Sequence, residues 1–102
     1  MEIEKNYDGS SLVIALKGRL DTMSSPELDV VVKTALIGVK SLTLDFAAVD
    51  YVSSAGLRVL LAAQKMMNKQ GKMQIRNVSR NIQEVFRMTG FDSIFTIENP
   101  AG

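Results

Sequence analysis

One short segment places small and hydroxylated residues where a predicted strand leads into a predicted helix. It reads Ser53-Ser54-Ala55-Gly56, and the amphipathic pattern of the helix continues from Leu57. The free N–H groups and the positive dipole end at a helix entrance suit a phosphoryl group. A serine here could carry phosphate without unfolding its own domain, whereas the added charge and bulk would disrupt a docked interface. The segment therefore indicates a phosphorylation switch.

The same segment also has a purely structural explanation. Ser53 or Ser54 would cap the helix through its side-chain oxygen, as serine commonly does. Gly56 would then serve only to bring the helix close to the sheet. The residue types alone leave both explanations open.

Composition excludes several kinds of chemistry. The chain has no cysteine and no histidine, which excludes disulfides, thiolate chemistry and a Ser-His-Asp mechanism, and disfavours zinc hydrolysis. It also lacks the GxxxxGK[ST] phosphate loop. The carboxylate pairs Asp45 with Asp50 and Asp21 with Glu27 are interpreted as solvated surface charge. We therefore expect no catalytic residue, no metal site and no cofactor, and a protein that is not an enzyme.

The charge balance gives no reason to expect nucleic acid or an anionic membrane as a partner. Net charge is +1, from 12 basic and 11 acidic residues, whereas nucleic-acid binding usually needs a basic excess. The first residues lack the pattern of a signal peptide. Apolar runs such as 59–63 are far shorter than the roughly 20 residues that span a bilayer. We expect a cytoplasmic protein without membrane insertion.

Strand and helix patterns alternate along the chain. Strands are predicted at 3–7, 12–16, 42–46 and 73–75, and helices after Ser25-Pro26, through 57–67 and after Ser79, with a short element at 94–97. The run 12–16 is continuously apolar, which predicts a strand covered on both faces, followed by a break at 18–24. Ser25 is the predicted cap of the first helix and Ser79 that of the third.

This order predicts an α/β fold in a single domain over residues 1–102. The opening hairpin supplies an antiparallel pair, and the strand–helix–strand units supply parallel neighbours joined by right-handed crossovers. We expect a mixed four- to five-stranded sheet with helices packed against it.

The sequence also resembles a known family. Residues 50–61, DYVSSAGLRVLL, resemble the signature of STAS domains, the anti-sigma factor antagonists of bacteria. Residues 16–21, LKGRLD, look like the family's G-x-[LIV]-D turn, and residues 85–91, VFRMTGF, look like its late helix. The resemblance covers nearly the whole chain in the right order.

The resemblance implies a specific role. Unphosphorylated members bind an anti-sigma factor that is also a serine kinase, and so release a sigma factor. The kinase modifies a serine at the head of the second helix, and a PP2C-type phosphatase resets it. The family motif D-S-[ST]-G-L places the acceptor at Ser54, with Ser53 as a rival because it replaces the aspartate. The implied partner contacts are Asp21, Thr22, Met23, Ser53, Ala55, Gly56 and Leu57.

Two other interpretations remain open. The chain could be a permanent STAS-like subunit of a membrane transport complex, in which Ser54 would be only a cap. A nucleotide-binding module is a weaker alternative, because doubly wound folds often bind nucleotides but this chain lacks a phosphate loop and a basic pocket.

Overall fold

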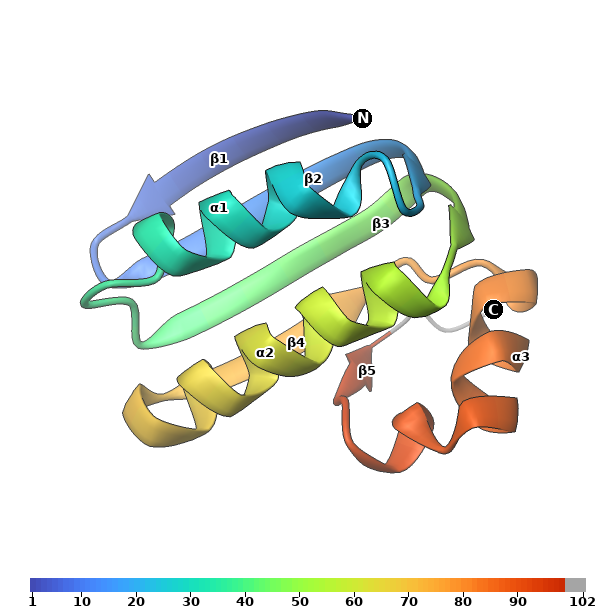
Figure 1. Cartoon of the computed structure of the whole chain (residues 1–102). Helices are drawn as coiled ribbons and strands as arrows, with labels where there is room; N and C mark the ends of the chain where they lie inside the picture. The colour runs from blue at the N-terminus through green and yellow to red at the C-terminus, as the bar shows by residue number, and fades with distance from the viewer. Residues whose placement is uncertain (99–102) are drawn as a thin grey trace.

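Five strands form one mixed sheet whose order in space follows their order in the chain (Figure 1). The computed structural model describes residues 1–98. The strands are β1 (Glu2–Asp8), β2 (Ser11–Leu20), β3 (Ser41–Val52), β4 (Lys72–Arg76) and β5 (Ile97–Glu98). β1 pairs antiparallel with β2, and the three later pairs are parallel. This arrangement confirms the predicted α/β fold with a mixed sheet.

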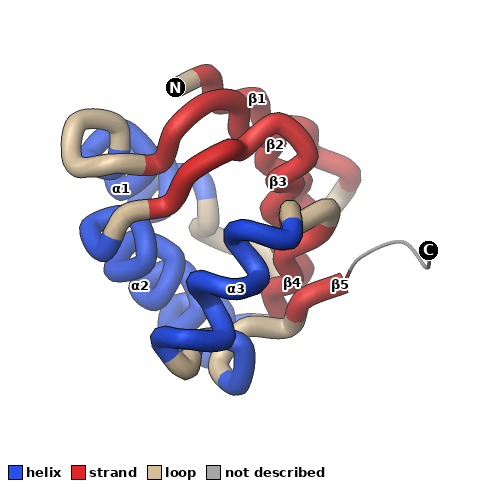
Figure 2. Tube along the Cα trace, turned by 90° about the vertical axis from the view of Figure 1, so that its right-hand side faces the viewer, coloured by secondary structure: helices blue, strands red, loops and turns tan. Residues whose placement is uncertain are grey.

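The three helices lie on one face of the sheet (Figure 1; Figure 2). They are α1 (Ser25–Ala35), α2 (Ser54–Gln70) and α3 (Arg80–Thr89), and a 3-10 turn, η1 (Phe91–Ser93), follows. Right-handed crossovers that always step in the same direction place their helices on the same side. Phe86 of α3 packs against Phe46 of β3, with ring centroids 6.4 Å apart. Among residues 1–98, no helix has the length and apolar character needed to cross a bilayer.

Only the helix-facing side of the sheet belongs to the core. The alternate residues Leu12, Ile14 and Leu16 of β2 are buried, whereas Val13 and Ala15 between them are half-buried. The prediction that this strand is covered on both faces was therefore wrong. Val13 and Ala15 are apolar, but they lie on the bare face of the sheet, the face that no helix covers. The continuous apolar run therefore does not mean that both faces are buried.

The second strand is also longer than its hydrophobic pattern indicates. β2 continues through Gly18 to Leu20, with shifts in register against β3 on either side of Gly18. Gly18 has a φ of 109°, which a residue with a Cβ rarely adopts. The predicted break at 18–24 is thus an irregular strand followed by a short loop. The Leu20 carbonyl at its end accepts a hydrogen bond from Ser53 N at 2.8 Å.

The helix caps agree with the sequence at α3 and differ at α1. Ser79 caps α3 as predicted, because its Oγ accepts from Ile82 N at 3.3 Å. Ser25, in contrast, is the first helical residue of α1, and its hydroxyl donates to the Asp21 carbonyl. The predicted Ser25 cap was therefore wrong, and Asp21 organises this helix entrance instead.

Candidate functional site

The entrance of α2 is fixed by Ser53. Its Oγ accepts from Gly56 N at 3.2 Å, and its carbonyl accepts from Leu57 N at 2.9 Å. Its own N–H donates to Leu20, as described above, so Ser53 joins the end of β2 to the first turn of α2. Ser53 is half-buried and its hydroxyl is the helix cap.

Ser54 has a different environment, although it is the next residue. It is the first residue of α2 and is exposed. Within residues 1–98 its hydroxyl forms no hydrogen bond. The first turn of α2 contains no acidic residue, so no carboxylate of its own helix competes with an added negative charge there. Of the two serines, only Ser54 presents a free hydroxyl.

Gly56 and Leu57 lie inside the domain, which corrects part of the predicted partner surface. Gly56 is buried, and a Cβ built on it would meet Leu20 Cγ at 2.7 Å. Leu57 is 5% exposed and belongs to the hydrophobic core. Their role is to seat α2 against the sheet, because a partner cannot reach buried atoms.

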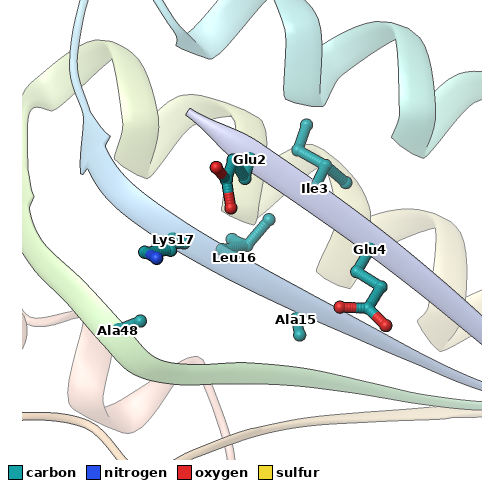
Figure 3. A pocket seen from close by; sticks show the side chains of 7 residues that line it. All are labelled: Glu2, Ile3, Glu4, Ala15, Leu16, Lys17 and Ala48. Atoms are coloured by element: carbon teal, nitrogen blue, oxygen red, sulfur yellow. The ribbon is translucent and has the colours of Figure 1, made fainter.

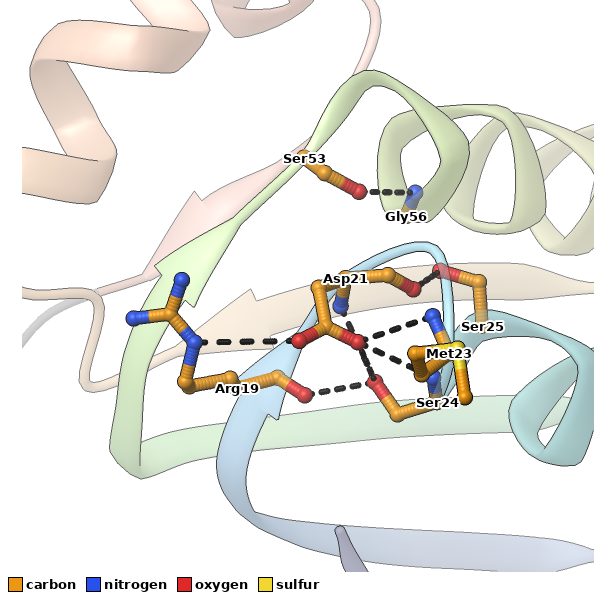
Figure 4. Close-up of polar contacts among 7 residues, drawn as sticks. All are labelled: Arg19, Asp21, Met23, Ser24, Ser25, Ser53 and Gly56. Carbon is orange, nitrogen blue, oxygen red and sulfur yellow. Dashed lines mark hydrogen bonds and ion pairs between the residues drawn. The ribbon is translucent and has the colours of Figure 1, made fainter.

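Asp21 organises the loop between β2 and α1 (Figure 4). Its Oδ1 accepts from the backbone N–H groups of Met23 and Ser24, both at 3.0 Å. Its own backbone N–H donates to Ser24 Oγ at 2.9 Å, and its carbonyl accepts from the N–H and hydroxyl of Ser25. The carboxylate is thus engaged in its own loop.

Arg19 completes this cluster at the end of β2. Its Nε lies 3.7 Å from Asp21 Oδ2, and its guanidinium carbon lies 4.2 Å from the ring centroid of Tyr51. The backbone N–H of Ser24 is the main cause that holds the pKa of Asp21 below its ordinary value, and Arg19 lowers it further. The exposed ring of Tyr51 is therefore partly covered by a guanidinium that is already paired.

We expect the β2–α1 loop to loosen in acid. Because the folded-state pKa of Asp21 is lowered, its stabilising effect is full above the ordinary value of 3.8 and is lost as pH falls through the lower folded value. Amide hydrogen exchange of Met23 and Ser24 should then accelerate relative to the β2 core. Asp21→Asn should keep the turn through its Oδ1 and lose this acid transition, whereas Asp21→Ala should loosen the loop at every pH. An unchanged loop in Asp21→Ala would contradict the assignment.

The two predicted segments meet in one shallow groove between the entrances of α1 and α2. The groove is lined by Thr22, Ser25, Pro26, Asp29, Ala55, Arg58 and Val59. Met23 follows Thr22 in the same loop, is 87% exposed and lines a separate hollow with Arg19 and Asp21. The groove therefore brings Thr22 and Ala55 together, and the bond from Ser53 N to the Leu20 carbonyl ties the two segments to each other, which agrees with the neighbourhood that the resemblance implies.

Three residues of this surface received no role from the sequence. Arg19 and Ser24 contact Asp21 in its loop, and their spacing in the sequence did not indicate these contacts. Arg58 carried a readable signal, because it follows Ser54 by four residues in a predicted helix and so shares its face.

A second hollow opens on the bare face of the sheet (Figure 3). Glu2, Ile3, Glu4, Ala15, Leu16, Lys17 and Ala48 line it. None of the predicted site residues reaches it, and its acidic and basic side chains lie on the two edge-proximal strands β1 and β2. It is separate from the entrance of α2.

The fold and the serine-capped helix entrance define a small α/β domain of the STAS type. A family model described as "Mlab, STAS domain" matches residues 3–97. This chain belongs to the STAS domain family.

Individual relatives agree with this assignment. BtrV of Bordetella bronchiseptica, named as a candidate anti-sigma factor antagonist, is 33% identical over 101 residues, covering 97% of this chain and 87% of BtrV. The crystal structure of an anti-sigma factor antagonist from Mycobacterium paratuberculosis has a TM-score of 0.86 at 20% identity, covering 98% of this chain and 86% of that one.

The Bacillus protein SpoIIAA shares the fold in two states. Its unphosphorylated form gives a TM-score of 0.76 at 17% identity, covering 98% of this chain and 90% of that one. Its phosphorylated form gives 0.77 at 18% identity, covering 98% and 92%. The likeness in fold is the same for both states.

Proposed function

We propose that this chain is an anti-sigma factor antagonist controlled by phosphorylation of Ser54. In this proposal the unphosphorylated form binds an anti-sigma factor that is also a serine kinase, which frees a sigma factor. The free, exposed hydroxyl of Ser54 beside the occupied hydroxyl of Ser53 carries the proposal. The name of BtrV and the two states of SpoIIAA support it.

The hydrogen bonds of the helix entrance favour Ser54 over Ser53 as acceptor. In the transfer, Ser54 Oγ bonds to the γ-phosphorus of ATP, the bond to the β–γ bridging oxygen breaks, and ADP leaves. The hydroxyl proton passes to a base of the kinase. Modification of Ser53 would instead turn the oxygen that accepts from Gly56 N into an ester oxygen, a weaker acceptor, and so disturb a cap that typically stabilises a helix by about 1 kcal/mol.

The immediate neighbours of Ser54 suit a docking surface of small and adaptable side chains. Thr22 and Ala55 in the groove are small, and the neighbouring Met23 is an exposed, adaptable apolar side chain. A doubly charged group placed here would have to be desolvated in the complex. Catalysis in this proposal belongs to the kinase and to a PP2C-type phosphatase, and this chain supplies the substrate serine and the binding surface.

The acceptor assignment predicts a simple pattern of intact masses. The chain is incubated with ATP, Mg²⁺ and the serine-kinase anti-sigma factor that this proposal assigns as its partner. The parent and Ser53→Ala should each gain one phosphoryl group, and Ser54→Ala none. A PP2C-type phosphatase should remove the group from the parent.

Two results would contradict the proposal. Modification that persists in Ser54→Ala and disappears in Ser53→Ala would show that Ser53, the cap of α2, is the acceptor. A chain that is never modified in its own cells and that purifies in a fixed complex with a transporter ATPase would be the structural subunit considered above.

A further inference from the structure

Arg58 is an arginine without an acidic partner at the edge of the proposed switch. It is exposed, lies in the second turn of α2 and lines the groove with Ala55. Within residues 1–98 it forms no ion pair. The acidic residue that shares the groove, Asp29, is paired with Lys33 at 2.8 Å. The guanidinium of Arg58 is therefore available to another anion.

Helix geometry places this guanidinium within reach of Ser54. The two residues are separated by four positions and so lie on the same face of α2, with Cβ atoms about 5–6 Å apart. Side chains of a helix lean toward its N-terminus, which turns Arg58 toward Ser54 rather than away from it. An arginine in this position can bind a phosphate through two parallel N–H groups.

We propose that Arg58 binds the phosphate of phosphorylated Ser54 within the same chain. This inference rests on the proposed function and adds to it the side chain that binds the phosphate once Ser54 is modified. The phosphate would be held across the first turn, beside Ala55 and the groove. Phosphorylation would then remove two features from the docking surface at once, the bare hydroxyl of Ser54 and the free guanidinium of Arg58.

The other charged groups near the helix entrance do not offer an equal alternative. Arg19 lies at the end of β2, but it is paired with Asp21 and stacked on Tyr51. The carboxylate of Asp21 is held by two backbone N–H groups of its own loop. Among the described residues, Arg58 is thus an unpaired cation that shares a helix face with the modified hydroxyl.

The proposal can be tested on the chain alone, with phosphoserine installed at position 54 during translation. The ³¹P shift of the phosphate is followed as a function of pH, because a bound guanidinium lowers the second pKa of phosphoserine from its ordinary value near 6. The titration midpoint should lie at lower pH in the parent than in Arg58→Gln. Lys69→Gln, which removes the same charge at an exposed position in the last turn of α2, 15 residues and so roughly 22 Å along the helix from Ser54, should leave it unchanged. Arg19→Gln should shift it less than Arg58→Gln.

A second measurement guards against a general change in the domain. Phosphoserine should raise the thermal unfolding midpoint more in the parent than in Arg58→Gln, each compared with its own unmodified form. Equal ³¹P midpoints in the parent and Arg58→Gln, or a larger shift in Arg19→Gln, would overturn the proposal. Because neither kinase nor partner is present, these results do not depend on whether the proposed function holds, which the mass pattern tests separately.

Discussion

Ser54→Asp is expected to weaken binding to the anti-sigma factor by about a hundredfold while leaving the domain folded. A carboxylate on this surface must be desolvated when the partner docks, and a penalty of about 3 kcal/mol corresponds to that loss of affinity. At the first residue of a helix the same charge is favourable by about 0.3–1 kcal/mol, so the unfolding midpoint should stay level or rise slightly. Calorimetric titration and thermal unfolding of the same samples measure both effects.

Two matched variants isolate the position of the charge. Ser54→Ala removes the hydroxyl without adding charge and should bind with nearly the parent affinity. Ser10→Asp adds the same charge in the exposed turn between β1 and β2, at the opposite end of the sheet from the entrance of α2 (Figure 1). It should also bind normally. Parent-like affinity of both Ser54→Asp and the chain with phosphoserine at 54 would remove the basis for a switch at this serine.

Much of this architecture could be predicted because the local signals and the tertiary packing agree. Leu42, Leu44 and Phe46 alternate in the sequence and face the helices in the structure. Ser79 directly precedes an amphipathic segment, and its Oγ accepts from Ile82 N, as the capping preference of serine predicts. Gly90 ends the same helix with a left-handed backbone.

The errors arose where tertiary contacts decide the outcome. The continuous apolar run of β2 could not show that Val13 and Ala15 lie on the bare face, because that depends on where the helices pack. Ser25 looked like a cap, but its hydroxyl is used by the Asp21 carbonyl, which a local pattern does not reveal. Gly18 looked like a terminator and is an irregularity inside a strand.

The candidate site shows the same division. The family resemblance implies that Asp21, Thr22 and Met23 lie beside Ser53, Ser54 and Ala55, and the structure joins these two segments through the bond from Ser53 N to the Leu20 carbonyl. The sequence alone could not distinguish residues that face a partner from residues that pack α2 against the sheet. Gly56 and Leu57 belong to the second kind because α2 enters directly over Leu20.

Gly56→Ala should lower the free energy of unfolding by about 2 kcal/mol, although alanine is the better helix former. Replacing glycine by alanine inside a helix gains about 1 kcal/mol of propensity. Here, however, the new Cβ would lie 2.7 Å from Leu20 Cγ and 2.9 Å from Leu20 O. Overpacking of this kind typically costs about 1–3 kcal/mol and occasionally more. The carbonyl cannot easily retreat, because it holds Ser53 N. The cost should therefore lie at the upper end, about 3 kcal/mol, which leaves a net loss of about 2 kcal/mol. The thermal midpoint should fall by roughly 10 °C in a domain of this size.

A double-mutant cycle with Leu20→Ala distinguishes this contact from a general intolerance of the first turn. Leu20 is 0% exposed, so Leu20→Ala alone should cost about 2–5 kcal/mol. Removing its side chain also makes room for the new methyl group, so the double variant should lose less stability than the sum, by about 1 kcal/mol or more. Strictly additive losses would show that the strain comes from the Leu20 carbonyl, which Leu20→Ala retains, and not from the Leu20 side chain. A favourable coupling energy would show instead that the position of α2 on the sheet depends on one close contact between Gly56 of α2 and Leu20 at the end of β2.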